Sequence, residues 1–126
     1  MAYAVEWEHR VVVVQGLPSP VRARLVRPLT PAGEGVPVVL RVGITFEDAQ
    51  LTERGWFVDT DEIAEIVREC GEELGGRRWT EMFDFRPTFE LVARHLFGRL
   101  AVRIPRLAFV ELRDDRFGVV TRYVPG

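Results

Sequence analysis

The sequence predicts an α+β fold, because strand patterns stand at both ends of the chain and two helical patterns stand between them. The strand patterns, clearest where apolar residues recur with a period of two, occupy residues 3–15, 36–46, 107–113 and 117–124. This ββααββ order favours an antiparallel four-stranded sheet with both helices packed on one face. The length of 126 residues suits a single domain that spans 1–126.

The first two strands are separated by a segment rich in proline and glycine. In the first strand, one face carries the residues Tyr3, Val5, Trp7, His9, Val11 and Val13. Two prolines in 16–20 end it, since proline cannot donate to a strand ladder. A short further strand is expected over 21–27, and a loop over 28–35. The second strand has six apolar residues at a strict period of two: Val36, Val38, Leu40, Val42, Ile44 and Phe46.

Both helices have recognisable ends. Asp59 is the expected N-cap of the first, with Glu62 three residues later as in a capping box, and Gly75-Gly76 is expected to end it. Thr88 is expected to cap the second helix directly after Pro87. Residues 77–86 between the helices are expected to form an irregular connection, and 114–116 to join the last two strands.

Composition excludes several classes of protein. All 17 basic residues are arginines and 19 residues are acidic, so a net charge of −2 argues against a nucleic-acid partner. The single cysteine, Cys70, excludes an intramolecular disulfide and is expected to be a core residue rather than a nucleophile. No stretch approaches the roughly 20 apolar residues of a membrane span. No signal peptide is visible, which predicts a cytoplasmic protein without membrane association.

Charge is unevenly distributed along the chain. Residues 47–73 contain two arginines and ten acidic residues, whereas residues 77–126 contain ten arginines and six acidic residues. The acidic middle and the basic end would attract each other across a subunit interface. The alternative is that the acidic residues form one solvated helix face.

Glu111 is the most informative polar residue, since it lies in the apolar stretch 107–112 and shares a predicted face with Leu107 and Phe109. A buried carboxylate needs hydrogen-bond donors. A ligand with two adjacent N–H donors, such as a guanidine-like edge, would supply them, and so would an ion pair with an arginine. Both interpretations remain open on the residues alone.

Few other residues suggest chemistry. His9 lies on an apolar strand face, where a core or interface histidine and a ligand are the alternatives, and His95 is expected on the helix surface. Two histidines and a helical cysteine make a poor zinc site, which usually needs three or four ligands. Each of Trp7, Trp56 and Trp79 is expected to pack in the core, with stacking on a flat heterocycle as the alternative.

Taken together, these segments resemble the 6-pyruvoyltetrahydropterin synthase and 6-carboxytetrahydropterin synthase family of T-fold (tunnelling-fold) proteins. The resemblance rests on the segments Gly55-Trp56-Phe57-Val58-Asp59, Pro87-Thr88-Phe89-Glu90-Leu91, Val110-Glu111-Leu112 and Glu6-Trp7-Glu8-His9-Arg10. It covers nearly the whole chain. It implies a T-fold domain, assembly through sheet edges into a homo-oligomeric ring, often a hexamer, and sites between subunits.

The chain departs from the family where catalysis would be expected. Glu34-Gly35-Val36 stands where the family has the His-Gly-His pair that binds zinc, and 29–33 contains no nucleophilic cysteine. The family's Asp-His pair would fall near 74–77, where neither residue occurs. The comparison therefore implies a protein without metal, cofactor or synthase activity, although whether it is another kind of enzyme stays undecided.

The recognition residues of the family are better preserved. The resemblance implies that Glu111 grips the amino-pyrimidinone edge of a pterin-like ligand, that Thr88 and Phe89 shape the pocket, and that Trp7 or His9 lines its other end. Two alternatives remain. One is an enzyme with metal-free chemistry on a pterin- or purine-like substrate, with His9, Glu34 or Asp84 as acid or base. The other is a non-catalytic assembly or regulatory protein.

Overall fold

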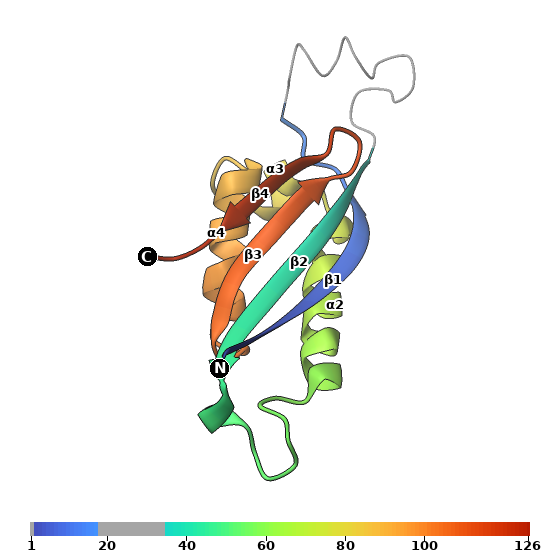
Figure 1. Ribbon diagram of the computed structural model, residues 1–126. Coiled ribbons are helices and arrows are strands. Elements are labelled where there is room, and N and C mark those ends of the chain that lie inside the picture. The colour runs from blue at the N-terminus through green and yellow to red at the C-terminus, as the bar shows by residue number, and fades with distance from the viewer. Residues whose placement is uncertain (1, 18–34) are drawn as a thin grey trace.

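A computed structural model describes residues 2–17 and 35–126, and it confirms the α+β class (Figure 1). Its four strands are β1 (Ala2–Val13), β2 (Val36–Glu47), β3 (Leu107–Asp114) and β4 (Val119–Tyr123). They form one antiparallel sheet in the order β1-β2-β3-β4, so each strand pairs with its neighbour in sequence. The strand expected over 21–27 lies outside the described residues.

Two main helices cover one face of this sheet, as expected (Figure 1). Helix α2 (Thr60–Gly76) packs on β1, and α4 (Phe89–Leu100) packs on β3 and β4. Asp59 caps α2 by accepting a hydrogen bond from the backbone N–H of Asp61, and Thr88 caps α4 by accepting one from Leu91. No helix among the described residues is long and apolar enough to cross a membrane.

The connection 77–86 differs from its expected irregular form, because it contains a short helix, α3 (Trp79–Met82). The indole of Trp79 is fully buried, and its Nε1–H donates to the Leu74 carbonyl at 3.0 Å. The Trp79 backbone N–H also donates to the Val14 carbonyl at 2.8 Å. The contact with Val14 joins distant parts of the chain, so local periodicity could not reveal it. A short 3-10 helix, η1 (Asp48–Gln50), was also missed.

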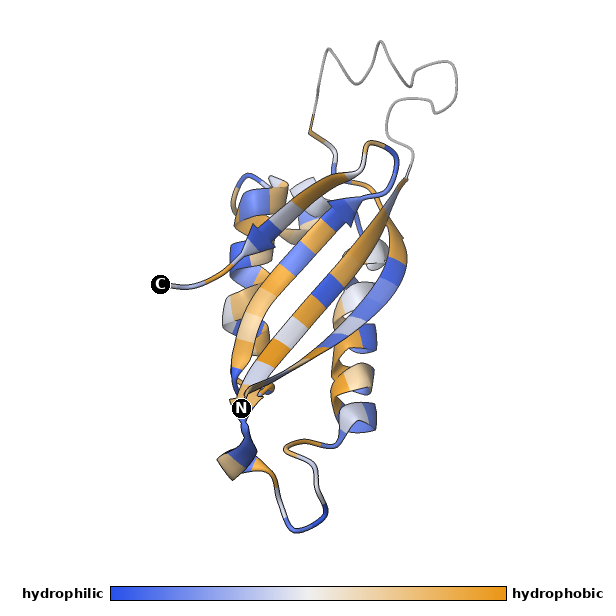
Figure 2. Cartoon of the chain, in the orientation of Figure 1, coloured by the Kyte–Doolittle hydropathy of each residue, from blue (hydrophilic) through white to orange (hydrophobic). Residues whose placement is uncertain are grey.

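The helix-facing side of the sheet is the apolar core. It includes the six period-two residues of β2, and Figure 2 shows orange and blue segments alternating along the strands. Trp79 lies in this core, Trp7 packs partly against it, and Trp56 is exposed at 41% with the guanidinium of Arg54 above its ring. The expectation of core packing is therefore wrong for Trp56. The expectation that Cys70 is a core residue is confirmed.

A β-bulge changes the faces predicted for β3. Ile44 pairs with Leu107 and Gly43 with Phe109, so Ala108 is an extra residue. Leu107 consequently packs against the helix-side core, whereas Phe109 and Glu111 lie on the opposite, open face. The expectation that Leu107 and Glu111 share a face is wrong, because it assumed unbroken alternation.

Part of the acidic middle and the basic end meet within a single chain. Glu73 of α2 pairs with Arg99 of α4 at 3.0 Å, and Glu69 pairs with Arg103 at 3.3 Å. All four side chains are about half exposed, so these pairs lie at the surface. Pairing of the two regions across a subunit interface remains a prediction.

Candidate functional site

The open face of the sheet carries a row of alternating charges. Strand register places Glu8, Arg41, Glu111 and Arg122 side by side on the four consecutive strands. Opposite charges on neighbouring strands attract each other across such a ladder. The two acidic and two basic residues therefore form a polar row across a sheet whose other face is apolar. We call this row the charge ladder.

Glu111 is the buried centre of the charge ladder, with 3% of the residue exposed. Its Oε1 accepts from Nε of Arg122 at 3.0 Å and from Nη2 at 2.7 Å. Its Oε2 lies 3.8 Å from Nη1 of Arg41, whose Nη2 contacts Glu6 at 2.6 Å. Two N–H donors from one planar group thus satisfy Oε1, and Arg41 is the charge nearest to Oε2. Burying a carboxylate requires such donors and charges around it.

An aromatic ring forms the floor beside this carboxylate. Phe109 lies opposite Gly43 on β2, where a Cβ atom would come within 2.3 Å of the ring. The absence of a side chain at position 43 therefore allows Phe109 to lie close to the strand. The guanidinium carbon of Arg122 is 3.9 Å from the centroid of the Phe109 ring, which is a cation–π contact. We call the position between Phe109 and Glu111, which the guanidinium of Arg122 occupies, the guanidinium slot.

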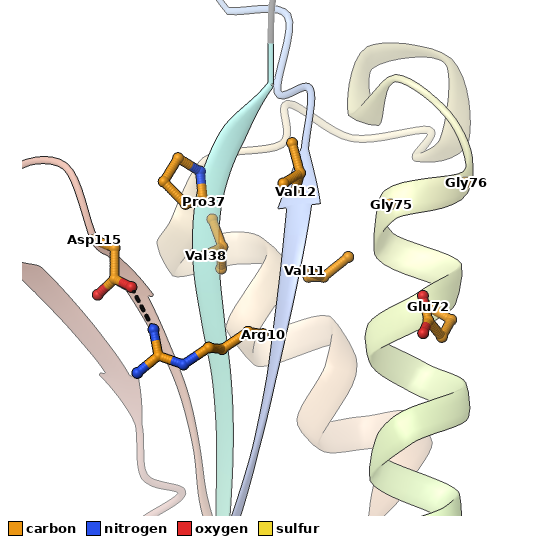
Figure 3. A pocket seen from close by; sticks show the side chains of 9 residues that line it. All are labelled: Arg10, Val11, Val12, Pro37, Val38, Glu72, Gly75, Gly76 and Asp115. Carbon is orange, nitrogen blue, oxygen red and sulfur yellow. Dashed lines mark hydrogen bonds and ion pairs between the residues drawn. The ribbon is translucent and has the colours of Figure 1, made fainter.

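A second ionic cluster lies nearer the β3–β4 turn. Asp115 contacts Arg113 at 2.9 Å and Arg10 at 2.8 Å, and Figure 3 shows Arg10 extending across β2 toward it. The hydrogen bond from Arg113 is the main reason that the pKa of Asp115 is lowered. Val39, between Arg10 and Arg113 in register, is buried although it lies outside the main core.

A pocket of about 620 Å³ lies at this end of the sheet (Figure 3). It extends from the Arg10–Asp115 pair past Val11 and Val12 to Glu72 and the C-terminal glycines of α2. None of the five residues expected to bind the ligand lines it. The pocket is therefore distinct from the guanidinium slot.

Trp7 and His9 lie on the other face of the sheet, between β1 and α2. The indole Nε1–H of Trp7 donates to the Thr60 carbonyl at 3.0 Å. Nε2 of His9 is 3.5 Å from a carboxylate oxygen of Glu72, and its ring lies over Gly71, where a Cβ atom would come within 2.4 Å. Glycine at position 71 thus allows β1 and α2 to approach closely around this histidine.

Thr88 and Phe89 lie at the start of α4. The Thr88 hydroxyl is the helix cap, and the buried Phe89 ring is 5.5 Å from that of Trp79. A single chain thus places the five expected ligand residues in three separate regions: Glu111 on the open face, Trp7 and His9 under α2, and Thr88 and Phe89 at the start of α4.

The candidate acid–base groups are also dispersed. His9 is beside Glu72, whereas Asp84 lies near His95, whose ring contacts Phe83 and Phe85; Glu34 lies outside the described residues. Partial burial is the main reason that the pKa of His95 is lowered. Burial likewise raises the pKa of the Cys70 thiol to about 11, which keeps it protonated and unreactive at neutral pH. Across residues 2–17 and 35–126, no group of three or more His, Cys, Asp or Glu side chains is placed to hold a metal ion.

Comparison with known proteins places this fold in a family. The family model described as 6-pyruvoyl tetrahydropterin synthase matches residues 39–123, about two thirds of the chain. The chain belongs to this family. A solved structure of the 6-pyruvoyl tetrahydropterin synthase of Caenorhabditis elegans superposes with a TM-score of 0.73 at 16% sequence identity, covering 100% of this chain and 97% of that one. This likeness confirms the T-fold. No curated protein matches the chain.

The sequence offered an arginine as one possible partner of Glu111 but did not identify Arg122, although one signal was available. A turn over 114–116 would have placed Glu111 opposite Val119, whereas the observed β3–β4 register places it opposite Arg122. The turn is longer than expected, because Asp114 accepts a hydrogen bond from the Arg116 N–H and Gly118 adopts a positive φ of 68°. A longer β3–β4 turn that ends at Gly118 predicts that Arg122 lies opposite Glu111.

Proposed function

We propose that this family member binds a pterin or a related heterocycle through Glu111. The observation that carries the proposal is the environment of this carboxylate, which is buried and accepts two N–H donors from one planar group. The amino-pyrimidinone edge of a pterin presents two adjacent N–H donors in a plane, as a guanidinium does. The membership of the chain in the 6-pyruvoyl tetrahydropterin synthase family supports the same ligand class.

We further propose that the complete site forms between subunits of a homo-oligomer, with a hexamer as the expected ring. Within one chain, Glu111, Thr88 and His9 lie in three separate regions, so they could act on one ligand only if another copy supplied some of them. The exposed edges of β1 and β4 provide strands on which further copies could pair. Native mass spectrometry would measure the number of subunits, and a strictly monomeric protein would contradict this part of the proposal.

The proposal does not include the synthase reaction. Gly35 and Val36 stand in the segment where the resemblance places zinc histidines, and Gly75-Gly76 stands where it places an Asp-His pair. The buried, protonated Cys70 does not replace the missing nucleophile. We expect no synthase turnover, with or without added zinc. Measurable zinc-dependent turnover would overturn this expectation.

Isothermal titration with neopterin tests the role of Glu111. We expect Glu111→Gln to weaken binding by about tenfold or more, because hydrogen bonds to a charged group contribute roughly 1.5–3 kcal/mol each. Asp115→Asn is the matched control, since Asp115 is also acidic but is about one third exposed and pairs with Arg10 and Arg113 instead. Equal binding by wild type and Glu111→Gln would refute the assignment of Glu111, and no binding by either would refute pterin recognition.

One observation favours a second candidate, a non-catalytic assembly or regulatory protein. Glu111 already has an intramolecular partner, since Arg122 supplies both donors to its Oε1. If this pair is purely structural, the pocket of the family is vestigial. Failure of wild-type protein to bind neopterin, together with a stable oligomer, would favour this candidate over ligand binding.

A further inference from the structure

We infer that the guanidinium slot is a binding site for planar N–H-rich groups, and that Arg122 occupies it as a built-in competitor. The inference extends the proposed function, on which its pterin component rests. It adds a stacking surface, Phe109, and a regulatory contact, Arg122, to the carboxylate that recognises the ligand.

The contacts of Arg122 match those that a flat heterocycle would make. Two of its nitrogens donate to one carboxylate oxygen of Glu111, at 2.7 and 3.0 Å, while its guanidinium carbon lies 3.9 Å from the Phe109 ring centroid. A planar ring with an amidine-like edge would gain the same two interactions, a donor pair in its plane and a stack on its face. Arg122 and such a ligand cannot occupy this position together.

Arg122 is placed so that it can leave the slot. Its side chain is 43% exposed, whereas that of Glu111 is 4% exposed. It comes from β4, which is an edge strand of the sheet formed by the described residues and pairs there with β3. Moving a long, half-exposed arginine into water requires little rearrangement, whereas Glu111 and Phe109 are held in the sheet. A ligand then binds by replacing Arg122 in the slot. Its apparent affinity is the intrinsic affinity multiplied by the fraction of molecules in which Arg122 has left the slot.

Arg41 lowers the electrostatic cost of releasing Arg122 from Glu111. When Arg122 leaves, Glu111 would be a buried carboxylate without its main partner, which is costly. Nη1 of Arg41 remains 3.8 Å from Oε2, and Arg41 is itself held by Glu6. The slot therefore retains one neighbouring positive charge while the Oε1 acceptor becomes available to the ligand.

The test compares full-length wild type with Arg122→Ala, using methylguanidinium, methylammonium and neopterin as probes. Arg10→Ala is the matched control, because it removes an arginine of the same face that pairs with Asp115 instead. We expect methylguanidinium to raise the melting temperature of Arg122→Ala more than that of wild type or Arg10→Ala. Methylammonium, which has the charge without the planar pair of donors, should not discriminate among the three.

With neopterin, Arg122→Ala should bind about tenfold more tightly than wild type, which corresponds to about 1.4 kcal/mol. The double variant Arg122→Ala/Glu111→Gln should lose both effects. If Arg122→Ala shows neither guanidinium selectivity nor tighter neopterin binding while wild type still binds neopterin, the inference is overturned and the proposed function stands. If methylguanidinium selectively stabilises Arg122→Ala but no variant binds neopterin, the slot and its competitor are supported and the proposed function is overturned.

Discussion

The two faces of the same sheet differ in what holds them together. On the helix-covered face, residues such as Leu40 and Leu112 are completely buried among other apolar side chains. On the open face, the neighbouring residues Arg41 and Glu111 are held by ion pairs, and Arg122, which pairs with Glu111, also makes a cation–π contact with Phe109. The covered face is stabilised by the removal of apolar surface from water, which does not depend on exact partners. The open face depends on directional pairs, which another group of the same geometry can replace.

The largest expected difference in stability is between substitutions at two adjacent residues of β3, whose side chains point to opposite faces of the sheet. Leu112→Ala should lower the free energy of unfolding by about 2–5 kcal/mol, because it leaves a cavity in the core. Arg113→Ala, one residue along, should change it by no more than about 1 kcal/mol, because Arg113 forms a partly exposed ion pair. Urea denaturation measures both values. Similar losses for the two variants would contradict the contrast between the faces.

A second test adds a methyl group to the open face of the sheet, next to Phe109. Gly43→Ala would put a Cβ atom 2.3 Å from the buried Phe109 ring, so the ring must shift. We expect a loss of about 1–3 kcal/mol, which is typical of overpacking. Gly98→Ala in α4 is the control, since a Cβ atom there meets nothing within 4 Å. The control should gain up to about 1 kcal/mol from improved helix propensity. A neutral Gly43→Ala would show that Phe109 is not tightly held.

Alkaline pH should lower the free energy of unfolding, because Cys70 is buried in the core of the helix-covered face. Burial raises its pKa from 9.0 to about 11, so the folded state retains its proton where the unfolded state loses it. This contribution is fully present below pH 9 and is lost as the pH rises from 9 through 11. The expected loss is about 1 kcal/mol at pH 10 and approaches about 3 kcal/mol above pH 11, given about 1.4 kcal/mol for each pKa unit over a shift from 9.0 to about 11. Urea denaturation of wild type and Cys70→Ala between pH 9 and 11 isolates this contribution. If the free energy of unfolding falls equally with pH in both proteins, the contribution of Cys70 is refuted.

The smallest effect is expected at the surface pairs that join the two helices of the covered face. Arg99→Ala removes the contact with Glu73, in which both side chains are about half exposed. It should cost between about 0 and 1 kcal/mol, and the cost should shrink at high salt. A double-mutant cycle with Glu73→Ala gives the coupling energy between the two. A coupling well above this range would show that surface ion pairs hold α2 and α4 together.

The elements and much of the core can be predicted from the amino-acid sequence. The period of two in β1 and β2 identifies which residues face the helices, and the caps Asp59 and Thr88 mark where those helices begin. These features depend on residues a few positions apart, so they can be read locally. The family resemblance drawn from four short segments was confirmed as well.

The surroundings of Glu111, in contrast, depend on contacts between distant parts of the chain. Its placement opposite Arg122 depends on the length of the turn that ends at Gly118, and its separation from Leu107 depends on the bulge at Ala108. A change of one residue in either feature moves side chains to another partner or another face. The sequence predicted a buried carboxylate that needs two donors. Strand register, which distant residues set together, decided that Arg122 would supply them.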